Sequence, residues 1–174
     1  PGMAFGTGTH PTTQLVLDFM EDVIDELNPK TLIDVGCGSG ILSIGALKLG
    51  VETALGVDVD MASVESSREN ADVNGIGDEF IIGQGSVDEI LAGEFPFKAA
   101  PLVVANILAP VLIRLMEAGM GKLVAPNGRL ILSGILEEKE ADIRATVSKH
   151  QLEIVERRQI GDWVAFALKS ASSS

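Results

Sequence analysis

The sequence predicts an α/β fold in which a mostly parallel, seven-stranded sheet ends in an antiparallel hairpin. Apolar strand-like runs alternate with helical stripes along most of the chain, which is the pattern of consecutive βα units. The first strand-like run ends in a turn that carries Gly36, Gly38 and Gly40, and a helical segment follows at once. The last two runs are separated by Gly161 and Asp162 alone, which is too short for a crossover connection, so we expect them to pair antiparallel.

Each element is placed by its own pattern. A first helix is predicted over 12–27, where an apolar stripe at helical spacing begins with Leu15, Val16, Phe19 and Met20. Strands are expected near 31–35, 53–58, 79–83, 101–106, 128–133, 151–159 and 162–168. The other helices are expected near 41–49, 61–74, 108–123 and 138–149.

Charge and cysteine content exclude several classes of protein. The chain has 174 residues, enough for one domain with a sizeable core, and a formal net charge of -12. Nucleic-acid binding depends on basic side chains that neutralise phosphates, and no basic stripe is present. No apolar run is long enough to span a membrane. The single cysteine, Cys37, indicates a reducing compartment, so we expect a cytoplasmic protein in which Cys37 is a small buried side chain.

The glycine spacing discriminates between cofactors. A dinucleotide-binding turn reads G-x-G-x-x-G, which would place the third glycine at position 41, where this chain has Ile41. The observed motif is D-x-G-x-G-x-G, from Asp34 to Gly40, and no G-K-[ST] sequence follows as it would in a triphosphate loop. The motif resembles the first motif of class I S-adenosylmethionine-dependent methyltransferases. A binding turn for NAD remains the alternative.

Two acids follow the second predicted strand. Asp58 lies at the strand's carboxyl end, where a carboxylate accepts hydrogen bonds from both hydroxyls of a ribose. This role fits S-adenosylmethionine and NAD equally well. Asp60 directly precedes the next helix and is expected to cap it.

Polar residues also follow the third and fourth strands. Many class I methyltransferases have an acid or amide after the third strand that binds the adenine amino group. This sequence lacks it, so Ser86, or a nearby backbone group, is the candidate for that contact. Asn106 ends the fourth strand, where the methyl acceptor is expected. Its side-chain oxygen can accept an N–H bond from an amine and aim the nitrogen lone pair at a methyl group. A turn residue at a strand end is the simpler alternative.

Four motifs in order resemble the PrmA family of bacterial methyltransferases, which modify the eleventh protein of the large ribosomal subunit. They are A-F-G-T-G-T-H-P-T-T at 4–13, D-V-G-C-G-S-G-I-L at 34–42, G-V-D-V-D at 56–60 and A-N-I-L-A at 105–109. The resemblance runs from Pro1 to about Lys169. It implies a class I methyltransferase catalytic domain over 1–169, whose residues 1–13 cover the cofactor, and a disordered tail over 170–174.

The resemblance also implies the site residues. The cofactor contacts are Thr13, Gly36, Asp58 and Asn106, with Asp34, Gly38, Ser86 and Thr7 as further candidates. The catalytic residue is Asn106, and no metal is expected. Gly8 and His10 share the N-terminal loop with Thr7, and His10 is expected to be structural rather than a base. The aromatic residues Phe5 and Trp163 are placed near the acceptor, where a ring face attracts a cation.

The function implied by the resemblance is transfer of methyl groups from S-adenosylmethionine to lysine side chains and an N-terminal amine of a basic ribosomal protein. The family has a substrate-recognition domain ahead of Pro1 that this sequence lacks, so we expect cofactor binding but poor methylation by this chain alone. Three alternatives stay open: a lysine methyltransferase with another protein substrate, an NAD-dependent oxidoreductase, and a non-catalytic S-adenosylmethionine-binding module.

Overall fold

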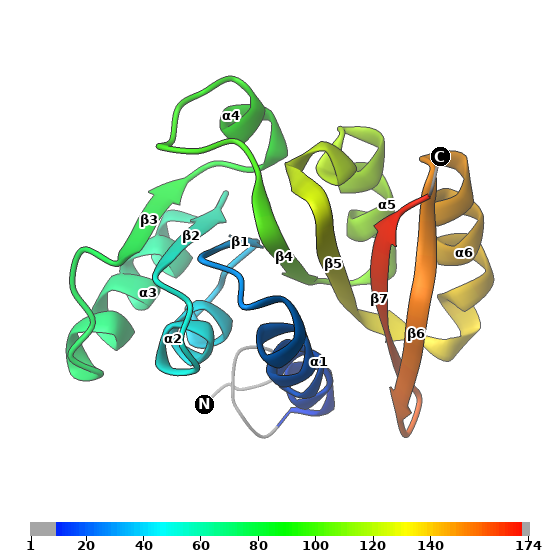
Figure 1. Cartoon of the computed structure of the whole chain (residues 1–174), viewed down its shortest axis with the longest axis horizontal. Helices are drawn as coiled ribbons and strands as arrows, with labels where there is room; N and C mark the ends of the chain where they lie inside the picture. The colour runs from blue at the N-terminus through cyan, green and yellow to red at the C-terminus, as the bar shows by residue number, and fades with distance from the viewer. Residues whose placement is uncertain (1–9, 172–174) are drawn as a thin grey trace.

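The computed structural model describes residues 10–171, which form a seven-stranded sheet with helices on both faces (Figure 1). The strand order is β3-β2-β1-β4-β5-β7-β6. The strands are β1 (Thr31–Val35), β2 (Thr53–Asp58), β3 (Phe80–Gln84), β4 (Ala100–Asn106), β5 (Val124–Leu136), β6 (Leu152–Ile160) and β7 (Trp163–Ser170). The first five are parallel, and β7 pairs antiparallel with both β5 and β6. The predicted sheet and its terminal hairpin are therefore confirmed.

The helices divide between the two faces because the strand side chains alternate. The helices are α1 (Pro11–Leu27), α2 (Ile41–Lys48), α3 (Met61–Val73), α4 (Val87–Leu91), α5 (Ala109–Glu117) and α6 (Glu140–Lys149), with short 3-10 turns η1 (Met120–Leu123) and η2 (Glu137–Lys139). In β1, Leu32 packs in the core beneath α1 and α2, whereas Ile33 packs in the core beneath α4, α5 and α6. Successive side chains of a strand point to opposite faces, so the sheet is buried on both sides.

Besides β5, which runs over Val124–Leu136 where a strand near 128–133 was expected, three local features differ from the sequence predictions. The helix α4 was not predicted, because five residues are too few to show a helical stripe. The helix expected over 108–123 ends at Glu117, because Gly119 adopts a φ of 105° that a continuing α-helix does not allow. The disordered tail expected over 170–174 is wrong for its first two residues: Ser170 is the last residue of β7, and the Ala171 N–H donates to the Gln151 carbonyl at 2.9 Å. The rest of that range lies outside the described residues.

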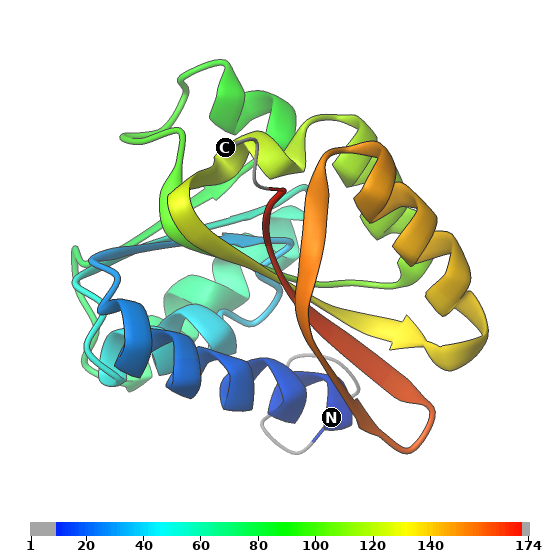
Figure 2. The same ribbon diagram turned by 45° about the vertical axis from the view of Figure 1, so that its right-hand side comes forward.

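The first turn of α1 lies at the carboxyl edge of the parallel strands. Its His10 ring contacts Trp163, the first residue of β7, edge to face, with 5.6 Å between ring centroids. Figure 2 shows this end of α1 beside the tip of the β6–β7 hairpin. Residues from the N-terminal segment and the C-terminal hairpin therefore meet at the edge where open α/β sheets bind ligands.

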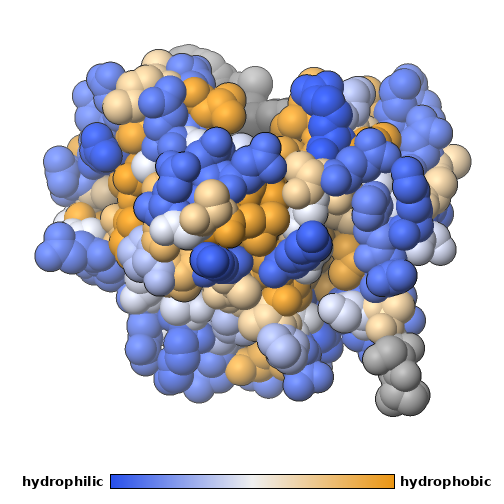
Figure 3. Space-filling view, turned by 90° about the horizontal axis from the view of Figure 1, so that it is seen from above, coloured by the Kyte–Doolittle hydropathy of each residue, from blue (hydrophilic) through white to orange (hydrophobic). Residues whose placement is uncertain are grey.

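The surface is largely hydrophilic on the face seen in Figure 3. Figure 3 shows a face on which hydrophilic side chains predominate and hydrophobic ones gather near the middle. Among residues 10–171, no helix is long and apolar enough to cross a membrane.

Candidate functional site

The glycine turn after β1 folds back onto β2. Gly36, Gly38 and Gly40 have φ values of 74°, 56° and 82°, a region that side chains with a Cβ rarely adopt. The N–H groups of Gly36 and Cys37 donate to the Val57 carbonyl at 2.8 and 2.9 Å. Gly40 is the N-cap of α2 and has no side chain that could cap this helix. Within the described part of the chain, the first N–H groups of α2 therefore have no N-cap side chain as acceptor, which suits an anionic ligand group.

Asp58 is fixed at the end of β2 by two backbone donors. Its Oδ2 accepts from the Gly38 N–H at 2.9 Å, and its Oδ1 accepts from the Asp60 N–H at 3.0 Å. Each carboxylate oxygen can accept a second bond, so the half-buried side chain can still receive two ligand hydroxyls. Asp60 Oδ1 accepts from the Ala62 N–H at 3.0 Å and caps α3, as predicted.

Asp34 lies beneath the glycine turn and is 1% exposed. Its Oδ2 accepts from the Ser43 hydroxyl of α2 at 2.9 Å, which links β1 to the helix after the turn. Burial, with a smaller contribution from the negative charge of Asp58, raises the pKa of Asp34 to about 7, although the Ser43 bond opposes the shift. Ser43 was not predicted as a partner of Asp34, because no local pattern links the two residues.

Cys37 is a buried thiol within the same turn. Its Sγ lies 3.4 Å from the hydroxyl of Ser67, which donates to the Gly38 carbonyl at 2.8 Å. Burial, and then the charge of Asp34, raises the pKa of Cys37 to about 12. A thiol that stays protonated is a poor nucleophile, so the interpretation of Cys37 as a small buried side chain is confirmed.

Asn106 and Thr13 meet although they are 93 positions apart. The Nδ2 of Asn106 donates to Thr13 Oγ1 at 3.5 Å, and Thr13 is fully buried. The Oδ1 of Asn106 is buried and has no hydrogen-bond partner among the residues described. A buried acceptor without a partner costs free energy unless a ligand satisfies it. Asn106 thus provides an available hydrogen-bond acceptor at the position where the sequence predicts that the substrate to be methylated binds.

His10 acts as the N-cap of α1. Its Nδ1 accepts from the Thr12 N–H at 3.2 Å, and it lies 2.8 Å from the Thr12 hydroxyl. This ring therefore has the structural role that was expected of it. Trp163 contacts the ring and lies at the same edge as Asn106. Thr7, Gly8 and Phe5 lie outside the described residues.

Ser86 is engaged in the start of α4. Its side chain accepts from the main chain of Glu89, and its own N–H donates to Glu89 Oε1 at 2.7 Å. The Ser86 N–H is therefore committed to this capping box, and only the hydroxyl proton remains for a ligand.

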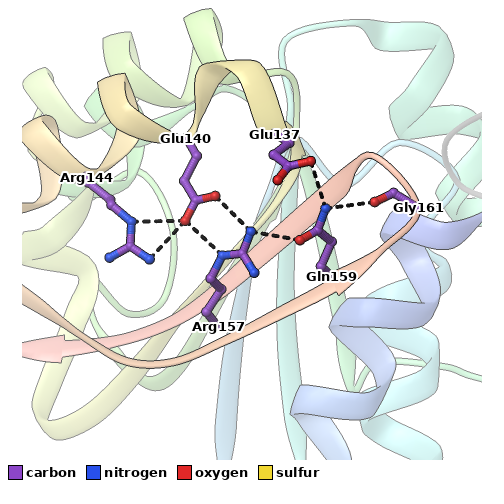
Figure 4. Close-up of polar contacts among 6 residues, drawn as sticks. All are labelled: Glu137, Glu140, Arg144, Arg157, Gln159 and Gly161. Atoms are coloured by element: carbon purple, nitrogen blue, oxygen red, sulfur yellow. Dashed lines mark hydrogen bonds and ion pairs between the residues drawn. The ribbon is translucent and has the colours of Figure 1, made fainter.

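An acidic hollow lies next to Trp163. It has a volume of about 400 Å³ and is lined by Leu136, Glu137, Glu138 and Asp162. Its outer wall, the hairpin tip, is held by Gln159, whose amide donates to Glu137 Oε1 at 3.1 Å and to the Gly161 carbonyl at 2.8 Å (Figure 4).

An ion-pair network fixes Gln159 in turn. Arg157 donates from Nη2 to the Gln159 side-chain oxygen at 2.8 Å, and it binds the two carboxylate oxygens of Glu140 through Nε and this same Nη2 (Figure 4). Arg144 also pairs with Glu140, at 2.9 Å. The network links α6 to the hairpin and, through Gln159, binds Glu137, one of the carboxylates of the hollow.

The described part of the chain offers no metal centre. Within residues 10–171, no three His, Cys, Asp or Glu side chains come together in a way that could hold a metal ion.

Residues 1–171 match a family model described as ribosomal protein L11 methyltransferase (PrmA). The chain is 44% identical to a ribosomal protein L11 methyltransferase of Herpetosiphon aurantiacus, over 95% of this chain and 56% of that protein. It is 43% identical to one from Exiguobacterium sp., over 97% of this chain and 52% of that protein. The chain thus spans about half the length of the curated relatives it matches.

Solved structures show the same arrangement. A crystal structure of ribosomal protein L11 methylase from Lactobacillus delbrueckii subsp. bulgaricus matches with a TM-score of 0.85 and 32% identity, over 99% of this chain and 83% of that one. An O-methyltransferase family protein from Burkholderia thailandensis matches with a TM-score of 0.71 at 16% identity, over 93% of this chain and 57% of that one, a likeness of fold alone. The fold is the class I methyltransferase fold that the sequence predicts.

Proposed function

This chain belongs to the ribosomal protein L11 methyltransferase (PrmA) family, and on that premise we propose that it binds S-adenosylmethionine and directs its methyl group to amines of that ribosomal protein. The observation that carries the proposal is the Oδ1 of Asn106, which is buried beside Thr13 at the carboxyl edge of the sheet and has no hydrogen-bond partner within residues 10–171. An amine N–H donated to this oxygen would satisfy it.

The residues of the edge fit the cofactor. Asp58 presents two pre-oriented acceptors for ribose hydroxyls, and the uncapped start of α2 suits a carboxylate. We assign cofactor contacts to Thr13, Gly36, Gly38, Asp58 and Asn106. Asp34 supports the turn from below, and Ser86 and Thr7 remain further candidates.

The proposed chemistry depends on orientation. The bound cofactor supplies an electrophilic methyl group on a sulfonium, so the protein needs only to present an amine lone pair in line with it. Asn106 Oδ1 holds the amine by one N–H and leaves the lone pair free. A free lysine is mostly protonated near neutral pH, with a pKa of about 10.4. A desolvated pocket lowers that pKa, so solvent can take the proton and no dedicated base is required.

The proposed acceptors are lysine side chains and the N-terminal amine of a basic protein, and the cytoplasm is the proposed location. A basic partner is supported by the net charge of -12 and by the acidic hollow next to Trp163. Carboxylates there can pair with cationic residues that flank the acceptor amine.

Calorimetric titration with S-adenosylmethionine, with NAD as the control ligand, tests the proposal first. We expect saturable one-to-one binding of S-adenosylmethionine and no binding of NAD. Binding of NAD alone would overturn the methyltransferase proposal in favour of an oxidoreductase. Transfer of a labelled methyl group to the ribosomal protein, analysed by mass spectrometry of its peptides, then identifies the acceptor amines.

A further inference from the structure

Ser133 is a fully buried hydroxyl residue in an otherwise apolar stretch of β5. It follows Leu130, Ile131 and Leu132, and its exposure is 0%. A buried hydroxyl is costly unless it forms a hydrogen bond. Its Oγ donates to the main-chain oxygen of Thr12, 121 positions earlier in the chain, at 2.9 Å.

This bond is not required to complete α1. A helix start leaves N–H groups unpaired, whereas the carbonyl of Thr12 lies within the first turn and accepts from the helix itself. The Thr12 N–H is already capped by His10. The Ser133 bond therefore ties α1 to the sheet and adds nothing to the helix.

The tie closes a ring of contacts around the end of β4. Asn106 pairs with Ser133 in the parallel register, and the Ile107 N–H donates to the Ser133 carbonyl at 3.1 Å. On the other side, the Asn106 amide reaches the hydroxyl of Thr13, the residue after Thr12. Ser133 thus holds the strand end that carries Asn106 and the helix turn that carries Thr13.

We propose that Ser133 is a positioning residue for the methyl acceptor, an inference that rests on the proposed function. The Asn106–Thr13 contact of 3.5 Å is long for a hydrogen bond, so a small movement of α1 away from β5 breaks it. The Asn106 amide is then free to rotate, and its open Oδ1 no longer points in one direction. Misplacement of a reacting group by 1 Å can cost about 100-fold in rate.

Ser133→Ala removes the tie without leaving a buried polar group unpaired, because the Thr12 carbonyl keeps its helical bond. We expect kcat to fall by roughly 10- to 100-fold. A second readout needs no catalysis: the side-chain NH2 signals of Asn106 in ¹⁵N NMR spectra, identified by their loss in Asn106→Asp. These signals should exchange slowly with water in the natural chain and faster in Ser133→Ala.

Thr146→Val is the matched control, since Thr146 is also buried and its hydroxyl donates to a carbonyl, that of Asp142, at 3.0 Å within α6. Thr146→Val should lose about as much stability as Ser133→Ala but leave kcat and the Asn106 signals unchanged. Ser133→Cys keeps a weak hydrogen-bond donor, so its kcat should be higher than that of Ser133→Ala. Unchanged Asn106 signals and kcat in Ser133→Ala, or equal changes in Thr146→Val, would overturn the inference. Loss of signal protection in Ser133→Ala, in a chain that binds no S-adenosylmethionine, would show that Ser133 positions Asn106 and would overturn the proposed function, and with it the role toward a methyl acceptor.

Discussion

The carboxylate of Asp58 accepts a hydrogen bond from the backbone N–H of Gly38 at 2.9 Å, which joins the end of β2 to the glycine turn after β1. Since the second oxygen accepts from Asp60, the plane of the carboxylate is set before any ligand binds. An acceptor that is already oriented loses little conformational entropy on binding. Asp58 thus shapes the turn as well as offering its own oxygens.

Asp58→Ala should therefore weaken binding of S-adenosylmethionine by roughly 10- to 100-fold, the loss expected when charge-assisted hydrogen bonds are removed. Calorimetric titration measures this. The neighbouring Asp60→Ala is the control: it removes the cap of α3 and should cost about 1 kcal/mol of stability with little change in affinity. Equal losses of affinity in the two variants would argue against a ribose contact by Asp58.

Asn106→Ala should lower kcat by about 100-fold while changing cofactor affinity much less, because the amide orients the acceptor. Steady-state kinetics with the acceptor protein, beside calorimetry with the cofactor, separate the two effects. Asn106→Asp keeps an acceptor oxygen, but its charge favours the ammonium form of the substrate. Its rate should recover as the pH rises, and an unchanged pH profile would count against contact with the amine.

Asp34 should make the chain less stable as the pH rises. Burial raises its pKa from 3.8 to about 7, so between these values the folded chain holds a proton that the unfolded chain releases. Stability is therefore highest below the lower value, falls by about 1.4 kcal/mol per pH unit through this window, and levels off above the folded pKa.

Urea unfolding of the natural chain and of Asp34→Asn at pH 5 and pH 8 checks this. Other titrating groups are common to both proteins, so the difference between them isolates Asp34. Relative to Asp34→Asn, the natural chain should lose up to roughly 3 kcal/mol between these pH values. A constant difference would show that Asp34 is ionised throughout.

Cys37 should resist alkylation in the folded chain. With its pKa raised to about 12, the thiolate fraction at pH 8 is roughly 1,000-fold lower than that of a free cysteine, and burial blocks the reagent as well. Reaction with a chromogenic disulfide in buffer and in denaturant measures the ratio, and Cys37 is the sole cysteine, so the signal is unambiguous. Rapid reaction of the folded chain would contradict the burial of Cys37 in the glycine turn.

Glu138→Lys should raise KM for a basic acceptor protein by several-fold at low salt, because Glu138 is an exposed wall of the acidic hollow. The effect should shrink at high salt as the charges are screened. Glu26→Lys makes the same change of charge in the last turn of α1, at the opposite edge of the sheet, and should leave KM unaltered. Similar effects of both variants would indicate a response to net charge alone.

The sequence by itself determined the features that depend on neighbouring residues. The glycine turn, Asp58 at a strand end, the Asp60 cap and the hairpin after Gly161 and Asp162 could be read because each needs only a few residues at fixed spacing. The class I fold followed from the order of such units. Whether Thr13, Gly36, Asp58 and Asn106 bind the cofactor stays a prediction.

Only the tertiary structure decided how distant residues combine. Thr13 meets Asn106 across 93 positions, and Ser133 reaches Thr12 across 121, because α1 packs its first turn against the ends of β4 and β5. The pKa of Asp34 likewise depends on burial, which no local pattern reports. Spacing along the chain fixes local backbone geometry, whereas packing sets which side chains lose water and which atoms come within bonding distance.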